Sequence, residues 1–198
     1  AKWLSGANLV NTRLYFSYAQ KTTPLDVPGT WGTPGAANSA TVTNLGPAYS
    51  EMQHDPAVPD AGEPVTVSLT AFDTDGIGTL ALFYSVNGGA FTSSAMTSIG
   101  NDRYSGTIPG QARGQVIQFY VRGQDFAGGV SHFPAAAENS RALIQVNDNQ
   151  ARLDQLHNLR IIMLSSDTSL LFRNTNRMSN DRLGATVVYD EKTVYYNV

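Results

Sequence analysis

The chain has 198 residues, a formal net charge of −3, a charged fraction of 15% and no cysteine. Lack of cysteine excludes disulfides and thiolate zinc sites. Lack of a basic block argues against nucleic acid as a partner, and no apolar run is long enough to span a membrane. A cysteine-free chain fits a cytosolic protein or a secreted bacterial one, and many Gly, Ser, Thr and Asn with few Lys favour the second.

Residues 1–44 predict an N-terminal remnant followed by a linker. Arg13–Tyr18 can form one short strand, whose apolar face needs a partner elsewhere. Seven of the nine prolines fall between Pro24 and Pro64, and proline interrupts regular strands. The stretch GTPGAANS resembles the closing segment of lamin-tail-like domains in secreted bacterial multidomain proteins.

Residues 45–147 predict a β-sandwich. Leu80, Leu82, Tyr84 and Val86 alternate with other residues, as in a half-buried strand, and Asn87-Gly88 then suits a type I′ hairpin turn. About seven short strands separated by turn signals are typical of an antiparallel two-sheet sandwich. The expected strands are 48–53, 65–71, 79–86, 90–96, 101–109, 115–123 and 141–146.

Four segments in this region carry a family resemblance. EPVTVSLTAFDTDG, LALFYSVNGGAF, RYSGTIP and VIQFYVRGQDFAGG, in that order, resemble the fibronectin type III and immunoglobulin-like modules of large bacterial surface proteins. The two immunoglobulin cysteines and a core tryptophan are absent, which leaves the fibronectin-like version. The expected fold class is all-β: a fibronectin III/immunoglobulin-like antiparallel sandwich with a small, incomplete α+β segment at its C-terminal side.

Residues 148–198 form that segment. A strand is expected at 159–163, a short helix capped by Ser165-Ser166-Asp167, and a hairpin with strands 184–189 and 193–198. An open edge and an apolar face on this hairpin predict self-association through 185–198.

The same segment resembles the opening of the CotH (spore coat protein H) kinase-like family. NLRIIMLSSDTSLLF and LGATVVYDEKTVYYNV carry the resemblance. It implies that the chain holds the start of a domain continuing past Val198, in which ATP and magnesium would bind. The family's phosphate-binding and catalytic residues would lie further on, so none is assigned here.

Asp73, Asp75 and Asp125 are the candidate metal ligands. Oxygen-rich, glycine-containing loops can hold calcium, and turns of a sandwich can meet at one end. The alternative is that Asp-Gly simply suits a tight turn. His54, His132 and His157 are expected on the surface or in loops, since none has a second histidine at ligand spacing.

Aromatic and arginine residues complete the candidates. Trp3, Trp31 and Tyr15–Tyr18 could stack on sugars or pack against the sandwich, and three tyrosines, at 189, 195 and 196, are expected in the hairpin. Arg173, Arg177 and Arg182 could meet phosphate or belong to a solvated loop.

We therefore predict a non-catalytic spacer or interaction module of a secreted or surface bacterial protein, placed before a CotH-like protein kinase domain. No nucleophile elbow, phosphate-binding loop or dinucleotide fingerprint occurs in the sequence. The alternatives are a carbohydrate-binding module and part of an atypical ATP-dependent protein kinase. A protein or carbohydrate surface is the expected partner.

Overall fold

The computed structural model describes residues 44–151, 157–176 and 183–198. The described residues divide into two compact units, one within 44–165 and 184–198, and one that contains residues 166–176 and 183. The predictions for residues 1–43, for Arg177 and for Arg182 lie outside the described residues. The division into 1–44, 45–147 and 148–198 stays a prediction.

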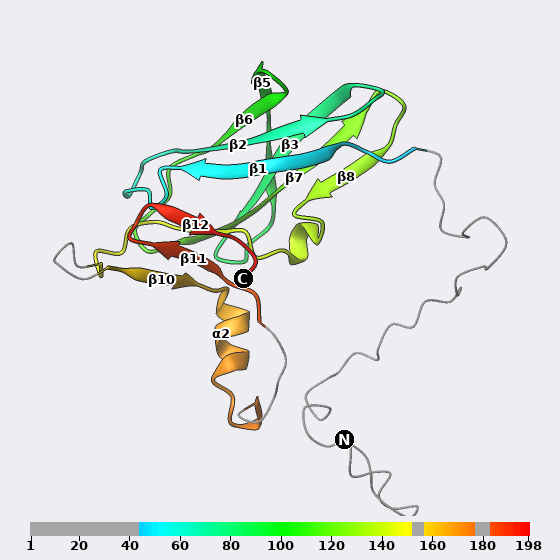
Figure 1. Ribbon diagram of the computed structural model, residues 1–198. Coiled ribbons are helices and arrows are strands. Elements are labelled where there is room, and N and C mark those ends of the chain that lie inside the picture. Colours follow the sequence, from blue (N-terminus) through cyan, green and yellow to red (C-terminus); the bar gives the residue numbers. More distant parts are fainter. Residues whose placement is uncertain (1–43, 152–156, 177–182) are drawn as a thin grey trace, which may run out of the picture. The chain divides into compact units, whose positions relative to one another are not determined.

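Two antiparallel sheets make the sandwich in the first unit (Figure 1). One has the strand order β1-β2-β6-β5, and the other has the order β4-β3-β7-β8, with β9 also paired to β7. The predicted all-β antiparallel sandwich with a small helical segment is confirmed. The strands are β1 (Ala48–Asp55), β2 (Val65–Phe72), β3 (Ile77–Val86), β4 (Thr92–Ala95), β5 (Thr97–Gly100), β6 (Arg103–Ile108), β7 (Val116–Asp125), β8 (Val130–Phe133) and β9 (Leu143–Gln145).

The alternating positions of the sequence form the core. Leu69, Leu82 and Phe119 are fully buried between the sheets, and each such side chain contributes about 1.5–3 kcal/mol relative to exposure. Further fully buried side chains include Val65, Val67, Ile108, Ile117, Val121 and Ile144. The middle of β7 is buried on both faces. On its outer side, Gln118 is buried and donates to the carbonyls of Glu138 and Ser140 at 2.8 and 2.7 Å.

The hairpin between β3 and β4 turns at Asn87-Gly88, as predicted. Both residues have positive φ, 51° and 75°, and the Gly89 N–H donates to the Val86 carbonyl at 3.0 Å. This is the backbone that a type I′ turn requires.

A third, three-stranded sheet belongs to the same unit as the sandwich. It contains β10 (Leu159–Ile162), β11 (Thr186–Tyr189) and β12 (Thr193–Tyr195) in that order. Its inner face packs against β9, where Ile162, Val188 and Leu143 form a small buried cluster. The strand and hairpin predicted for this segment are therefore present.

Short helices complete the described residues. The 3-10 helix η2 (Ala137–Asn139) lies in the first unit. The predicted helix is α2 (Ser165–Leu171), which is followed by the 3-10 helix η3 (Asn174–Asn176), and apart from Ser165 both belong to the second unit. None of the helices among the described residues is long and apolar enough to cross a membrane.

We expect Phe119→Ala to lower the free energy of unfolding by about 3–5 kcal/mol, because it leaves a cavity between the sheets. Urea denaturation of the purified chain measures this. The matched control is Phe126→Ala, since the Phe126 side chain is 76% exposed, and its effect should stay within about 0.5 kcal/mol. Equal losses in both variants would contradict the assignment of the core.

Candidate functional site

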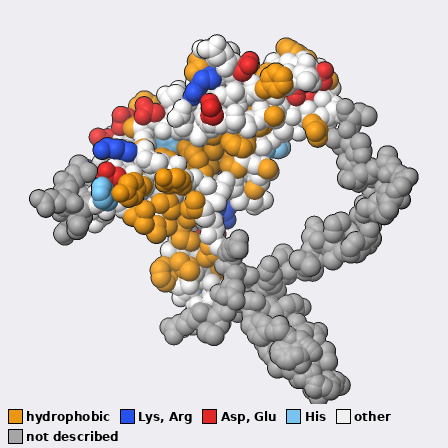
Figure 2. Space-filling model, in the orientation of Figure 1, with side chains coloured by type: hydrophobic (Ala, Val, Ile, Leu, Met, Phe, Trp, Pro, Cys, Tyr) orange, Lys and Arg blue, Asp and Glu red, His pale blue; other side chains and the backbone are white. Residues whose placement is uncertain are grey.

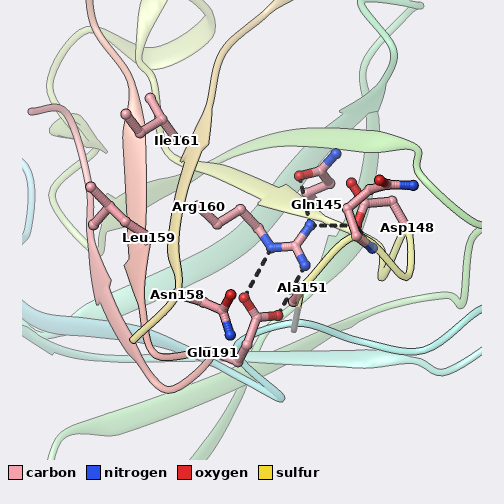
Figure 3. Close-up of a pocket in the computed structure, with 9 residues that line it drawn as sticks. Gln145, Asp148, Ala151, Asn158, Leu159, Arg160, Ile161 and Glu191 are labelled. Carbon is pink, nitrogen blue, oxygen red and sulfur yellow. Dashed lines mark hydrogen bonds and ion pairs between the residues drawn. The ribbon is translucent and has the colours of Figure 1, made fainter. Parts of the chain in front are cut away.

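A buried arginine on β10 joins the three-stranded sheet to the sandwich. The Arg160 side chain is 8% exposed, and its guanidinium donates in three directions (Figure 3). Nη1 donates to Asp148 at 2.9 Å and to Gln145 at 3.0 Å, while Nη2 donates to Glu191 at 3.0 Å. Nε also reaches Glu191, at 3.4 Å, so this pair is bidentate.

The ion pairs decide the charge state of this cluster. Burial alone would lower the pKa of Arg160, but the hydrogen bonds and charges of Glu191 and Asp148 outweigh it and raise that pKa. Burial alone would raise the pKa of Asp148, but the Gln150 N–H and then Arg160 hold it below its usual value. Arg160 and Asp148 are therefore both charged at neutral pH.

A polar hollow of about 340 Å³ lies beside Arg160, between β10 and the segment that follows β9 (Figure 3). A second hollow, of about 400 Å³, shares Ala151 and Glu191 with it. Because the guanidinium already meets two carboxylates, it would have to break an ion pair to bind an external anion. The cluster is therefore built to hold two parts of the chain together.

Glu191 reaches Arg160 from a tight turn. Asp190 and Glu191 both have positive φ, 53° and 57°, and the Lys192 N–H donates to the Tyr189 carbonyl at 3.0 Å. Neither residue is glycine, so the backbone conformation carries a cost. The ion pair with Arg160 offsets that cost.

The residues after β12 enter the sandwich itself. The Tyr196 ring packs edge-on against Phe119 at 5.7 Å, and its hydroxyl contacts Nδ1 of His54. The His54 Nε2 lies 3.0 Å from the Ala57 carbonyl, which can only accept. His54 therefore donates a hydrogen bond from Nε2, and its Nδ1 accepts a hydrogen bond from the Tyr196 hydroxyl.

The prediction that His54 lies on the surface is wrong, since it is only 6% exposed. His54 belongs to β1, which runs two residues past the predicted end of this strand, and a bulge in β1 decides which face His54 lies on. The pairing with β2 shifts between Ser50 and Gln53, and Glu51 has φ 52°. The extra residue reverses which side chains after the bulge point inward, and this places His54 on the inner face instead of the outer face.

Burial lowers the pKa of His54 to about 4, against the smaller opposing effects of Ala57 and Asp55. An unfolded histidine titrates near 6.5, so the unfolded state binds the proton first as pH falls. We expect this group to cost nothing above pH 6.5, and to remove about 3 kcal/mol of stability between pH 6.5 and 4. Urea unfolding across this range measures the loss.

The matched variant for this experiment is His54→Gln, which cannot titrate. Subtracting its pH profile from that of the natural sequence isolates the histidine from other acid-sensitive groups. If both proteins lose stability with the same slope between pH 6.5 and 4, His54 does not fold as the neutral form.

The three predicted metal ligands come together at one end of the sandwich. One carboxylate oxygen from each of Asp73, Asp75 and Asp125 lies within 4.8 Å of the others. Asp125 is buried and accepts hydrogen bonds from Asn44 Nδ2 at 2.9 Å and from the Gly129 N–H at 2.8 Å. Carboxylates at this spacing are the ligands that calcium prefers, and each Asp125 oxygen keeps a further lone pair.

Turn chemistry accounts for two of these residues as well. Asp73 Oδ1 accepts from the Asp75 N–H at 2.8 Å, and Asp125 fixes the turn to Gly129. Asp75 is exposed. Calcium at this cluster stays a prediction, and Asp75 is the ligand whose loss disturbs the turns least.

We expect millimolar calcium chloride to raise the melting temperature by a few degrees, because a ligand at about 100 times its Kd stabilises the folded state by about 2.7 kcal/mol. Differential scanning calorimetry measures the shift. Asp75→Asn should abolish it, whereas Asp102→Asn, at another exposed turn, should keep it. A shift of the same size in both variants would exclude the aspartate cluster.

The outer face of the three-stranded sheet is apolar and exposed. Leu159, Ile161, Tyr189 and Tyr195 are 62%, 60%, 41% and 52% exposed. Leu159 lies opposite Tyr189, and Val187 lies between Ile161 and Tyr195, so these side chains are neighbours. Figure 2 shows hydrophobic side chains gathered where β10–β12 lie. We call these five residues the outward face.

The three hairpin tyrosines point in two directions. Tyr196 packs against the sandwich core, whereas Tyr189 and Tyr195 face outward, and the His157 ring stacks on Tyr189 at 5.4 Å. The inner face of residues 185–198 is covered by the chain itself, through Thr186 and Val188. Self-association through this segment stays a prediction.

The remaining candidates are dispersed. His132 lies in β8 beside Tyr120, and Arg173 is exposed between α2 and η3. Sequence reasoning missed Arg160 and Glu191. The available signal was a charged residue inside the apolar run NLRIIM together with an acidic turn in the following hairpin.

Comparisons with known proteins give little. No family model matches the chain, and no curated protein does. Among solved structures, one titled "Crystal structure of Br derivative BhCBM56" matches with 16% identity and a TM-score of 0.31, covering 42% of this chain and 91% of that one. A likeness this distant carries no argument about function.

Proposed function

We propose that this chain is a non-catalytic spacer and interaction module of a secreted or cell-surface bacterial protein, and that it interacts through the outward face. The observation that supports this most is the contiguous apolar surface on β10–β12, with side chains 41% to 62% exposed. Contiguous apolar patches on a folded domain mark interaction sites. The sandwich supplies the rigid support.

Three contacts hold the outward face in a fixed position on the sandwich. Arg160 pairs with Asp148 beyond β9. Thr186 Oγ1 donates to the Arg141 carbonyl at 2.5 Å and accepts from the Leu143 N–H at 2.9 Å. Tyr196 fills a place in the core beside Phe119. A docking surface gains affinity when it is pre-organised in this way.

The resemblance of residues 158–172 and 183–198 to the opening of the CotH kinase-like family suggests which partner binds the outward face. In this proposal the sandwich precedes a CotH-like protein kinase domain, and β10–β12 pack against the remainder of that domain. ATP and magnesium would be bound by residues outside this chain. The ion pairs of Arg160 support a structural role for it rather than phosphate binding.

A carbohydrate partner is the second candidate. Tyr189 and Tyr195 present exposed rings on the same face of one sheet, and aromatic faces suit pyranose rings. In this candidate, calcium would bind separately, at the cluster of Asp73, Asp75 and Asp125.

Photo-crosslinking in the purified natural gene product tests the proposed function. A benzophenone amino acid at Tyr195 should crosslink to residues of another domain of the same protein, identified by mass spectrometry. The control position is Thr97, an exposed residue of β5 in the sandwich, where no crosslink to that domain is expected.

The outcomes separate the candidates. A crosslink from position 195 to a kinase-like domain supports the proposal in full. No crosslink, together with displacement of an apolar dye by a soluble oligosaccharide from the natural sequence but not from Tyr195→Ser, would favour the carbohydrate candidate. Equal crosslinking from positions 97 and 195 would contradict a dedicated outward face.

A further inference from the structure

We propose that the free edge of β10 is a docking site for an extended peptide segment, which pairs with the backbone of Leu159 and Ile161 and places a basic side chain beside Asp148 and Glu191. This inference rests on the proposed function, because it names the kind of partner that the interaction module takes. It concerns the edge of the sheet rather than its outward face.

The hydrogen-bond alternation of the sheet defines the free edge. The Asp190 N–H donates to the Asn158 carbonyl at 2.8 Å, so Asn158 directs its carbonyl toward the β11 side. The register pairs Arg160 with Val188 and Ile162 with Thr186. In an antiparallel ladder alternate residues bond the same neighbour, so Leu159 and Ile161 direct their N–H and C=O groups away from β11.

None of the described strands pairs with those backbone groups. Within the described part of the chain, β11 is the only strand that pairs with β10. The hollow of about 340 Å³ runs along the other edge, lined by Leu159, Arg160 and Ile161 on one side and by Gln145, Asp148 and Gln150 on the other. A row of unpaired backbone groups beside a hollow is a template for an added strand.

The charges of the hollow select the side chain that enters it. Asp148 and Glu191 carry two negative charges against the single positive charge of Arg160. A residue of the added strand opposite Arg160 would point to the same inner face. A lysine or arginine there balances the cluster, whereas a glutamate or phosphoserine would add repulsion.

The flanking residues of the added strand would point the opposite way. They would lie beside Leu159 and Ile161, which are 62% and 60% exposed on the outward face. Apolar residues at these positions would extend the outward face by one strand and cover part of it. The expected ligand is therefore an extended segment of the pattern apolar–basic–apolar.

The probe for this site is the synthetic peptide acetyl-Thr-Val-Lys-Val-Thr-amide, titrated into the ¹⁵N-labelled full chain and followed by NMR. We expect the amide signals of Leu159 and Ile161 to shift with a Kd below about 1 mM. Replacing the peptide lysine by glutamate should weaken binding about tenfold. The N-methylated peptide, which cannot pair along its backbone, should not bind.

Two protein variants complete the experiment. Ile161→Pro removes a backbone N–H on the free edge of β10, so peptide binding should be lost. This N–H makes no bond to β11, and edge positions tolerate proline, so the fold should be kept. Tyr195→Ser alters the outward face on β12, away from the edge, and should keep peptide binding. If Ile161→Pro does not fold, the N-methylated peptide gives the same test with the natural sequence.

Three results would overturn the inference. One is no shift of Leu159 or Ile161 at about 1 mM peptide, and another is equal binding of the lysine and glutamate peptides. The third is a shift of these amides on dilution without peptide, which would mean that a second copy of the chain occupies the edge. A failed peptide titration with a successful crosslink from position 195 would leave the proposed function standing.

Discussion

The arrangement of this chain depends on one buried guanidinium. Removing Arg160 from water is costly unless every donor finds a partner. Gln145 and Asp148, at and just after the end of β9, and Glu191, in the β11–β12 turn, supply those partners. Because the partners come from beyond β9 and from the β11–β12 turn, satisfying one side chain fixes where the third sheet lies on the sandwich. The outward face and the β10 edge have defined positions for this reason.

A second junction works through packing rather than charge. Tyr196 places a ring from the end of the third sheet beside Phe119, and its hydroxyl is accommodated by a neutral His54. The sandwich core and the third sheet therefore share side chains. The sandwich and the third sheet therefore belong to one compact unit, although the sequence resemblances assign them to different families.

Period-two alternation was enough to predict most of the sandwich. Residues such as Leu82 and Phe119 lie where alternation places them, and Asn87-Gly88 turns as its chemistry requires. The strands β5 and β8 escaped prediction because TSIG and VSHF are short and largely polar. His54 was expected on the surface because it has no second histidine at ligand spacing, and that spacing cannot reveal that β1 continues to Asp55 and carries a bulge that turns His54 inward. The strand expected at 159–163 contains Arg160, but sequence reasoning gave that residue no role, because its partners Asp148 and Glu191 lie outside this strand.

The turn at Asp190-Glu191 has a consequence for the order of folding. Two non-glycine residues at positive φ disfavour the β11–β12 hairpin as an isolated structure, and short hairpins are marginal even with favourable turns. Its stabilising partner, Arg160, is itself acceptable in the interior only when Asp148 is in place. We therefore expect the hairpin to form late, by closing onto a sandwich that has already folded, rather than to act as the nucleus for it.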